Sequence, residues 1–165
     1  MRILVISNCE ADRAAAKAQL SPRHTLTLAS NQAEASKLLQ YDGGLPQLDI
    51  VFVDAALKET DGGMEIGIFI ALSAAKIARY VGVFCDQEHY FHESAVCLED
   101  LNVMGENRPT PLKLGNTELF ISNNDKWLCE FSPENLDKPL GQGHRCKNPI
   151  IAKNYKEYAN YILTC

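Results

Sequence analysis

The sequence lacks the features of a membrane-embedded, nucleic-acid-binding or disulfide-rich secreted protein. Its most apolar stretch, residues 66–78, is well short of the roughly 20 residues that span a bilayer. It has no block of Lys and Arg, and 21 acidic residues against 16 basic ones give a net charge of −5. Phosphate backbones and anionic lipids attract the opposite balance of charge. We therefore expect neither nucleic acid nor a membrane as a partner.

Cysteine is present but forms no recognisable pattern. The six cysteines are spread along the chain without CxxC spacing, and the N-terminal run MRILVISN is too short and too uncharged for a signal peptide. Reduced thiols and a cytoplasmic location are therefore expected. A length of 165 residues suits one domain, since chains usually divide only beyond about 250 residues. We expect residues 1–165 to form a single domain.

The first half of the chain alternates between strand and helix patterns. Continuous apolar runs at residues 2–6, 48–53 and 80–84 are typical of strands that are covered on both faces, as in the middle of a parallel sheet. Helices are expected at residues 11–20, 31–40 and 66–78, and an outer strand at residues 24–28. This alternation predicts a doubly wound α/β fold.

The pattern loosens after residue 84. Residues 93–104 keep helical spacing only roughly and predict a short helix. Residues 112–114 and 117–122 are expected to form a hairpin, because Gly115-Asn116 supplies a two-residue turn that tolerates positive φ.

A long connection separates this hairpin from the last helix. Residues 124–147 hold the single tryptophan, Trp127, and are much longer than the usual 2 to 6 residues of such connections. We interpret them as an insertion. Asn148 and Pro149 then suggest the start of a terminal helix, which would bury one apolar face. That face comprises Ile151, Tyr155, Tyr158 and Ile162.

The residues around Asp54 resemble the phosphoacceptor region of response-regulator receiver domains. Asp54 ends a strand, Leu57 follows three residues later, and Asp61-Gly62 follows at seven and eight residues. The similarity covers residues 1–123 and the last helix. It implies a flavodoxin-like, five-stranded parallel sheet of order 2-1-3-4-5, in which Asp54 is the phosphoacceptor equivalent.

The chain departs from the family at the metal site. Phosphoryl transfer to a carboxylate requires Mg²⁺, which receivers hold with an acidic pair at the end of strand one. Ser7 and Asn8 stand at those positions. The nearby acids Glu10 and Asp12 lie on the loop and first helical turn, so they would reach the same point only with a rearranged loop. We expect no bound cofactor, although a weak site for Mg²⁺ or another divalent ion near Asp54 stays open.

The phosphoryl-binding positions differ as well. Receivers place a Ser or Thr after strand four and a Lys after strand five, where this chain has Cys85 and Ser122. Serine cannot supply the missing positive charge. Lys58 and Lys126 are candidate substitutes, although neither occupies the matching position. The resemblance therefore implies a degenerate receiver.

Two further groups contain possible metal ligands. His89 and His92 are three residues apart and can share a helical face, so with Asp86 they can form a His/carboxylate site. The alternative is that they are solvated surface residues. A weaker set lies in the insertion: Cys129, His144 and Cys146.

Three functions are consistent with this pattern. The first is a pseudo-receiver that acts by binding another protein through residues 93–104, 117–122, the last helix and the 124–147 insertion. The second is a working phosphoacceptor that uses Asp54, and the third a small metal-dependent enzyme that uses Asp86, His89 and His92. We identify no catalytic set, and a homodimer stays open.

Overall fold

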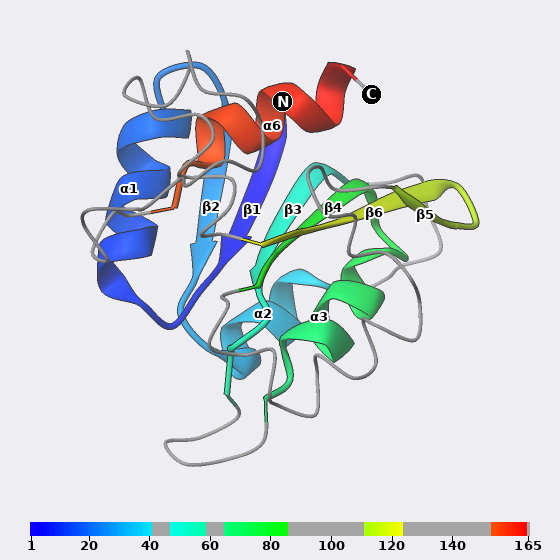
Figure 1. The fold of residues 1–165 in the computed structure, drawn as a ribbon. Helices are drawn as coiled ribbons and strands as arrows, with labels where there is room; N and C mark the ends of the chain where they lie inside the picture. Colours follow the sequence, from blue (N-terminus) through cyan, green and yellow to red (C-terminus); the bar gives the residue numbers. More distant parts are fainter. Residues whose placement is uncertain (41–46, 59–64, 86–110, 124–152, 165) are drawn as a thin grey trace, which may run out of the picture.

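The computed structural model of the chain describes residues 1–40, 47–58, 65–85, 111–123 and 153–164. These residues form a six-stranded sheet with four helices (Figure 1). The strands are β1 (Arg2–Ile6), β2 (Thr25–Ala29), β3 (Leu48–Asp54), β4 (Ala78–Cys85), β5 (Leu112–Leu114) and β6 (Thr117–Asn123). The helices are α1 (Glu10–Leu20), α2 (Gln32–Leu38), α3 (Gly67–Ala74) and α6 (Tyr155–Thr164).

The sheet is mostly parallel and has the order β2-β1-β3-β4-β6-β5. Five strands in the order 2-1-3-4-5 were expected, and this count and order are wrong. The difference arises at the edge, where Gly115, with φ of 63°, turns the chain so that β5 pairs antiparallel with β6. The first arm of the hairpin thereby becomes a sixth strand.

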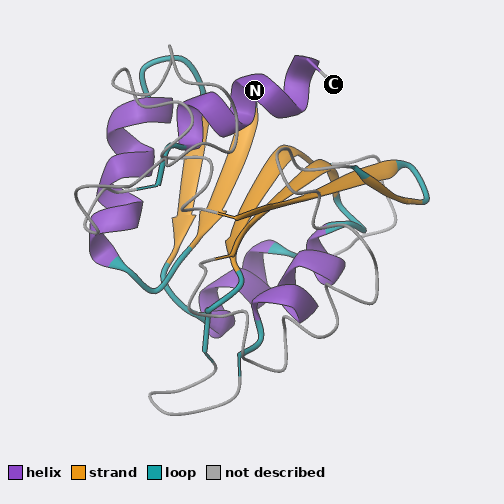
Figure 2. Cartoon of the chain, in the orientation of Figure 1, coloured by secondary structure: helices purple, strands orange, loops and turns teal. Residues whose placement is uncertain are grey.

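Helices cover both faces of the sheet. In Figures 1 and 2, α6 lies above the sheet and α1 to its left, while α2 and α3 lie below it. Alternate residues of the central strands divide between the two sides: Ile3 and Phe52 face α1 and α6, whereas Leu4 and Val53 face α2 and α3. The expected α/β class is confirmed, and the arrangement is compatible with a doubly wound fold. None of the described helices is long and apolar enough to cross a membrane.

Two helices differ from the sequence-based expectation. The apolar stretch 66–78 is a helix only as far as Ala74, and β4 begins at Ala78, where it pairs with Leu48 of β3. The last helix begins at Tyr155, with the side chain of Asn154 accepting a hydrogen bond from the amide of Glu157 at 3.2 Å. The expected helix 93–104, the insertion 124–147 and the pair Asn148-Pro149 lie outside the described residues.

Helix α6 is anchored to the middle of the sheet by aromatic residues. Tyr158 is fully buried among them, and its hydroxyl donates to the carbonyl of Phe120 at 2.9 Å and to that of Val83 at 3.3 Å. Its ring packs against Phe52 and Phe84, with centroids 5.4 and 4.9 Å away. This anchor fixes the position of the helix start next to the ends of β1 and β3.

A close backbone contact holds α3 against the end of β3. A Cβ atom placed on Gly67 would lie 2.1 Å from the carbonyl oxygen of Asp54 and 2.6 Å from Cα of Ala55. Only glycine leaves room for this approach, because both neighbouring atoms belong to the backbone. The first residue of α3 thus helps to set the position of Asp54.

Replacing Gly67 by alanine should therefore destabilise the protein by about 3 kcal/mol or more, since the backbone must move to admit the methyl group. Urea unfolding measures the change. Gly115→Asn is the matched control, because nothing lies within 4 Å of a Cβ there and asparagine tolerates positive φ. It should cost less than about 1 kcal/mol. Equal effects of the two substitutions would contradict the proposed close contact.

Candidate functional site

Three polar side chains meet where β1 and β3 end. Ser7 directly follows β1, Asp54 is the last residue of β3, and Asp12 lies in the first turn of α1. All three are buried: Ser7 completely, Asp54 with 7% exposure and Asp12 with 8%. In open α/β sheets, this edge at the carboxyl ends of the strands is where ligands bind.

Lys153 supplies the counter-charge for both carboxylates. Its ammonium nitrogen lies 2.6 Å from Oδ2 of Asp12 and 2.5 Å from Oδ2 of Asp54, and the residue is only 4% exposed. Lys153 stands two residues before α6, so one side chain connects the helix start to α1 and β3. We refer to Ser7, Asp12, Asp54 and Lys153 as the Lys153 cluster.

Hydrogen bonds fix the remaining atoms of the cluster. The Ser7 hydroxyl lies 3.4 Å from Oδ2 of both carboxylates and accepts a bond from the amide of Cys9 at 3.2 Å. Oδ1 of Asp54 accepts from the amide of Ala56 at 3.1 Å. Both carboxylate oxygens of Asp54 therefore already have donors within the protein.

Aromatic rings form one wall of the cluster. The Lys153 ammonium lies 5.7 Å from the ring centroid of Phe84, within the range of a cation–π contact. The ring of Tyr155 packs edge-on against Phe84 and Phe52 at 5.0 and 5.6 Å. These rings exclude water, which strengthens the attraction between the ammonium and the carboxylates.

Burial and charge act in opposite directions on Lys153. Burial acts to lower the pKa of its ammonium, but the charges of Asp54 and Asp12 together with their hydrogen bonds outweigh it, so the pKa is raised. Burial and the same two carboxylates raise the pKa of Tyr155 far above its ordinary value. The folded state therefore favours a protonated lysine and a neutral tyrosine.

A glutamine from α1 holds the backbone on either side of this contact. Nε2 of Gln19 donates to the carbonyl of Lys153 at 3.1 Å, and Oε1 of Gln19 accepts from the amide of Lys156 at 3.1 Å. Helix α1 therefore contributes both Asp12 and Gln19 to positioning Lys153.

Only some of the expected site residues come together in the structure. It brings Ser7 and Asp54 together and adds Asp12 without any rearranged loop, because α1 already begins at Glu10. Asn8 and Glu10 are exposed. Lys58, considered as a substitute cation, is exposed too, and its backbone pairs with Glu65.

For two other candidate site residues the structure describes only the backbone, and the remaining candidates lie outside the described residues. Cys85 ends β4, and Ser122 lies beside Phe84 in the register of β6. Outside the described residues lie Asp86, His89, His92, Lys126, Cys129, His144 and Cys146. Within the described part, no group of three or more His, Cys, Asp or Glu side chains is arranged to hold a metal ion.

Lys153 was not identified from the sequence. It lies 99 residues from Asp54 and 141 from Asp12, and no motif surrounds it. On a helix that buries Ile151, Tyr155, Tyr158 and Ile162, residue 153 would lie on the opposite, exposed face. Its side chain is buried because the helix begins only at Tyr155.

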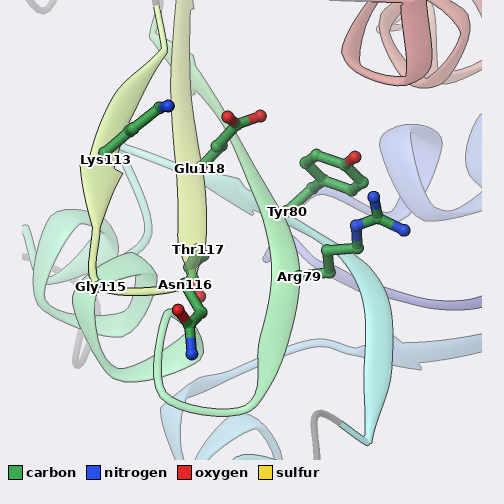
Figure 3. Close-up of a pocket in the computed structure, with 7 residues that line it drawn as sticks. All are labelled: Arg79, Tyr80, Lys113, Gly115, Asn116, Thr117 and Glu118. Atoms are coloured by element: carbon green, nitrogen blue, oxygen red, sulfur yellow. The ribbon is translucent and has the colours of Figure 1, made fainter.

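A polar hollow lies at the end of the sheet that is farther from the Lys153 cluster. It has a volume of about 240 Å³ at the amino ends of β4 and β6 (Figure 3). Arg79 lies over the ring of Tyr80 at 5.0 Å, while Lys113 faces Glu118 across the hairpin. The side chains that line this hollow carry charges of both signs, so they do not indicate a particular class of ligand.

Comparisons with protein-family models, curated proteins and solved structures found no match to this chain. Conclusions about its function therefore depend on the geometry of the Lys153 cluster.

Replacing Lys153 by methionine should reduce the free energy of unfolding by about 3 to 5 kcal/mol, because two buried carboxylates lose their counter-charge. Urea unfolding at pH 7 measures the loss. Lys156→Met is the matched control, since Lys156 is exposed three residues further on, and it should change stability by less than about 0.5 kcal/mol. Similar stability of the two variants would mean that the ion pairs contribute nothing.

Stability should fall at alkaline pH. The raised pKa values of Lys153 and Tyr155 mean that the unfolded chain releases these protons first, so the stabilisation is complete below pH of about 10 and declines above it. Urea midpoints between pH 8 and pH 11 should show this decline. Tyr155→Phe should have a shallower decline, and an unchanged slope would contradict the assignment.

Proposed function

We propose that this chain is a degenerate receiver-like module that acts by binding another protein and that contains its own cation in place of a metal ion. The observation that supports this proposal is the position of the Lys153 ammonium between Asp12 and Asp54. In a phosphoacceptor receiver, an acidic pair at the end of strand one holds Mg²⁺ next to the phosphoacceptor aspartate, and Ser7 and Asn8 stand at those two positions here.

An ammonium group cannot perform the role of the metal ion. Mg²⁺ coordinates carboxylate, water and phosphoryl oxygens together in octahedral geometry and so aligns the donor with the carboxylate. The lysine instead donates hydrogen bonds to Oδ2 of Asp54 and of Asp12. Oδ1 of Asp54 accepts from Ala56, so each oxygen of this carboxylate already accepts a hydrogen bond, which lowers its reactivity toward a phosphoryl group.

The relationship to receivers is part of the proposal. The parallel strands β2, β1, β3, β4 and β6 follow one another across the sheet, and helices lie on both faces. We interpret β5 as an edge strand added to a flavodoxin-like arrangement. The position of Asp54 at the end of β3 supports this interpretation.

The partner is proposed to bind on the side that contains β6 and α6. The residues that connect these two elements in sequence, 124–147, belong to the same proposed surface, as does the segment 93–104. A second copy of the chain is the alternative partner. A cytoplasmic setting fits the exposed free thiol of Cys9.

Incubation with acetyl phosphate and Mg²⁺ should leave the protein unphosphorylated, because Ser7 and Asn8 replace the metal-binding acidic pair and Lys153 already forms ion pairs with Asp12 and Asp54. Intact-mass spectrometry detects the addition of a phosphoryl group. Asp54→Asn is the control for any labelling elsewhere. A stable mass increase that disappears in Asp54→Asn would overturn the proposal in favour of a working phosphoacceptor.

A further inference from the structure

The start of α6 is held by three side chains that act on adjacent residues. Lys153 binds the two carboxylates, Asn154 caps the helix through the amide of Glu157, and Gln19 bridges the backbone of Lys153 and Lys156. The apolar side of the helix is held differently, by Tyr155, Tyr158 and Ile162 in the core. The backbone at Lys153 and Asn154, just before the helix, therefore depends on polar contacts that this buried side does not share.

We propose that the Lys153 cluster is an ionic latch that couples the charge of Asp12 and Asp54 to the docking of the first turn of α6. The inference rests on the proposed function, since it concerns the same cluster, and it adds a conformational output to it. In the latched state, the ammonium is buried between both carboxylates. In the released state, Lys153 and Asn154 leave α1 and the end of β3, while Tyr155 and Tyr158 stay anchored in the core.

The coupling follows from the burial of the ammonium. A charged lysine next to Phe84 and Tyr155 is stable there only while opposite charge surrounds it. Once that charge is lost, the side chain must reach water. Because the whole residue is 4% exposed, its backbone must move as well, and this movement breaks the bonds to Gln19.

The two carboxylates act together. If one of them is neutralised, the other still forms an ion pair with Lys153, and the latch holds. If both are neutralised, the ammonium has no counter-charge and the first turn is released. An event that removes charge from this pocket is thereby transmitted to the surface of α6.

Amide hydrogen exchange measured by NMR on the full chain tests the latch. The amides of Lys156, Glu157 and Tyr158 each donate to an acceptor within the first turn or on Gln19, so they should be protected in the wild type. The amide of Ala55, which donates to Phe84 at 2.9 Å, serves as the reference in the sheet.

In the double variant Asp12→Asn/Asp54→Asn, the amides of Lys156 and Glu157 should exchange within about tenfold of the rate of an unfolded peptide. The amide of Ala55 should remain at least about a hundredfold slower than that rate. Asp54→Asn alone, Asp12→Asn alone and the control Lys156→Met should keep the protection of the wild type.

Two results would overturn the latch. Continued protection of Lys156 and Glu157 in the double variant would show that the helix start does not need the ion pairs. Loss of protection at Ala55 as well would show that the cluster supports the whole sheet rather than one turn. Neither result bears on phosphorylation of the wild type, which the acetyl phosphate experiment decides separately.

Discussion

The ammonium of Lys153 between two buried carboxylates is the constraint on which the site depends. Each of the three charges would be costly alone in this place, because aromatic rings and the end of the sheet exclude water. Together they are stable, and they connect β3, α1 and the start of α6. The close approach of Gly67 to Asp54 and the bridge made by Gln19 both serve to keep these charges in place.

The fold was predictable where local pattern and burial agree. The apolar runs of β1, β3 and β4 are covered on both faces, so their composition alone identified them, and Gly115-Asn116 identified the hairpin. The first arm of this hairpin was expected, but the resemblance implied a sheet of only five strands. The three residues of β5 become its sixth strand by pairing with β6. The end of α3 was missed for a related reason: residues 75–78 (Ala-Lys-Ile-Ala) are compatible with either a helix or the approach to a strand, and the pairing of Ala78 with Leu48 of β3 decides between them.

Two of the four residues of the Lys153 cluster could be predicted from the sequence. Ser7 and Asp54 were identified because parallel strands bring their carboxyl ends to one edge, which is a property of the fold class. Asp12 was judged out of reach, since only the actual start of α1 shows that its side chain turns inward. Lys153 could not be inferred, because its contacts span 99 and 141 residues and depend on where α6 packs. Lys58 was the candidate substitute cation near the expected positions in the sequence, but the fold leaves its side chain exposed.

A tethered cation differs from a metal ion in a way that bears on function. A bound Mg²⁺ dissociates and exchanges with solvent, so a site built on it responds to the supply of metal. A lysine on the same chain has a high effective concentration at its carboxylates and remains bound at any external metal level. Its binding also fixes the backbone that carries it, here the first turn of α6. Under the proposed function, the chain presents one constant surface to its partner, and that surface changes only when the charge of both Asp12 and Asp54 is removed.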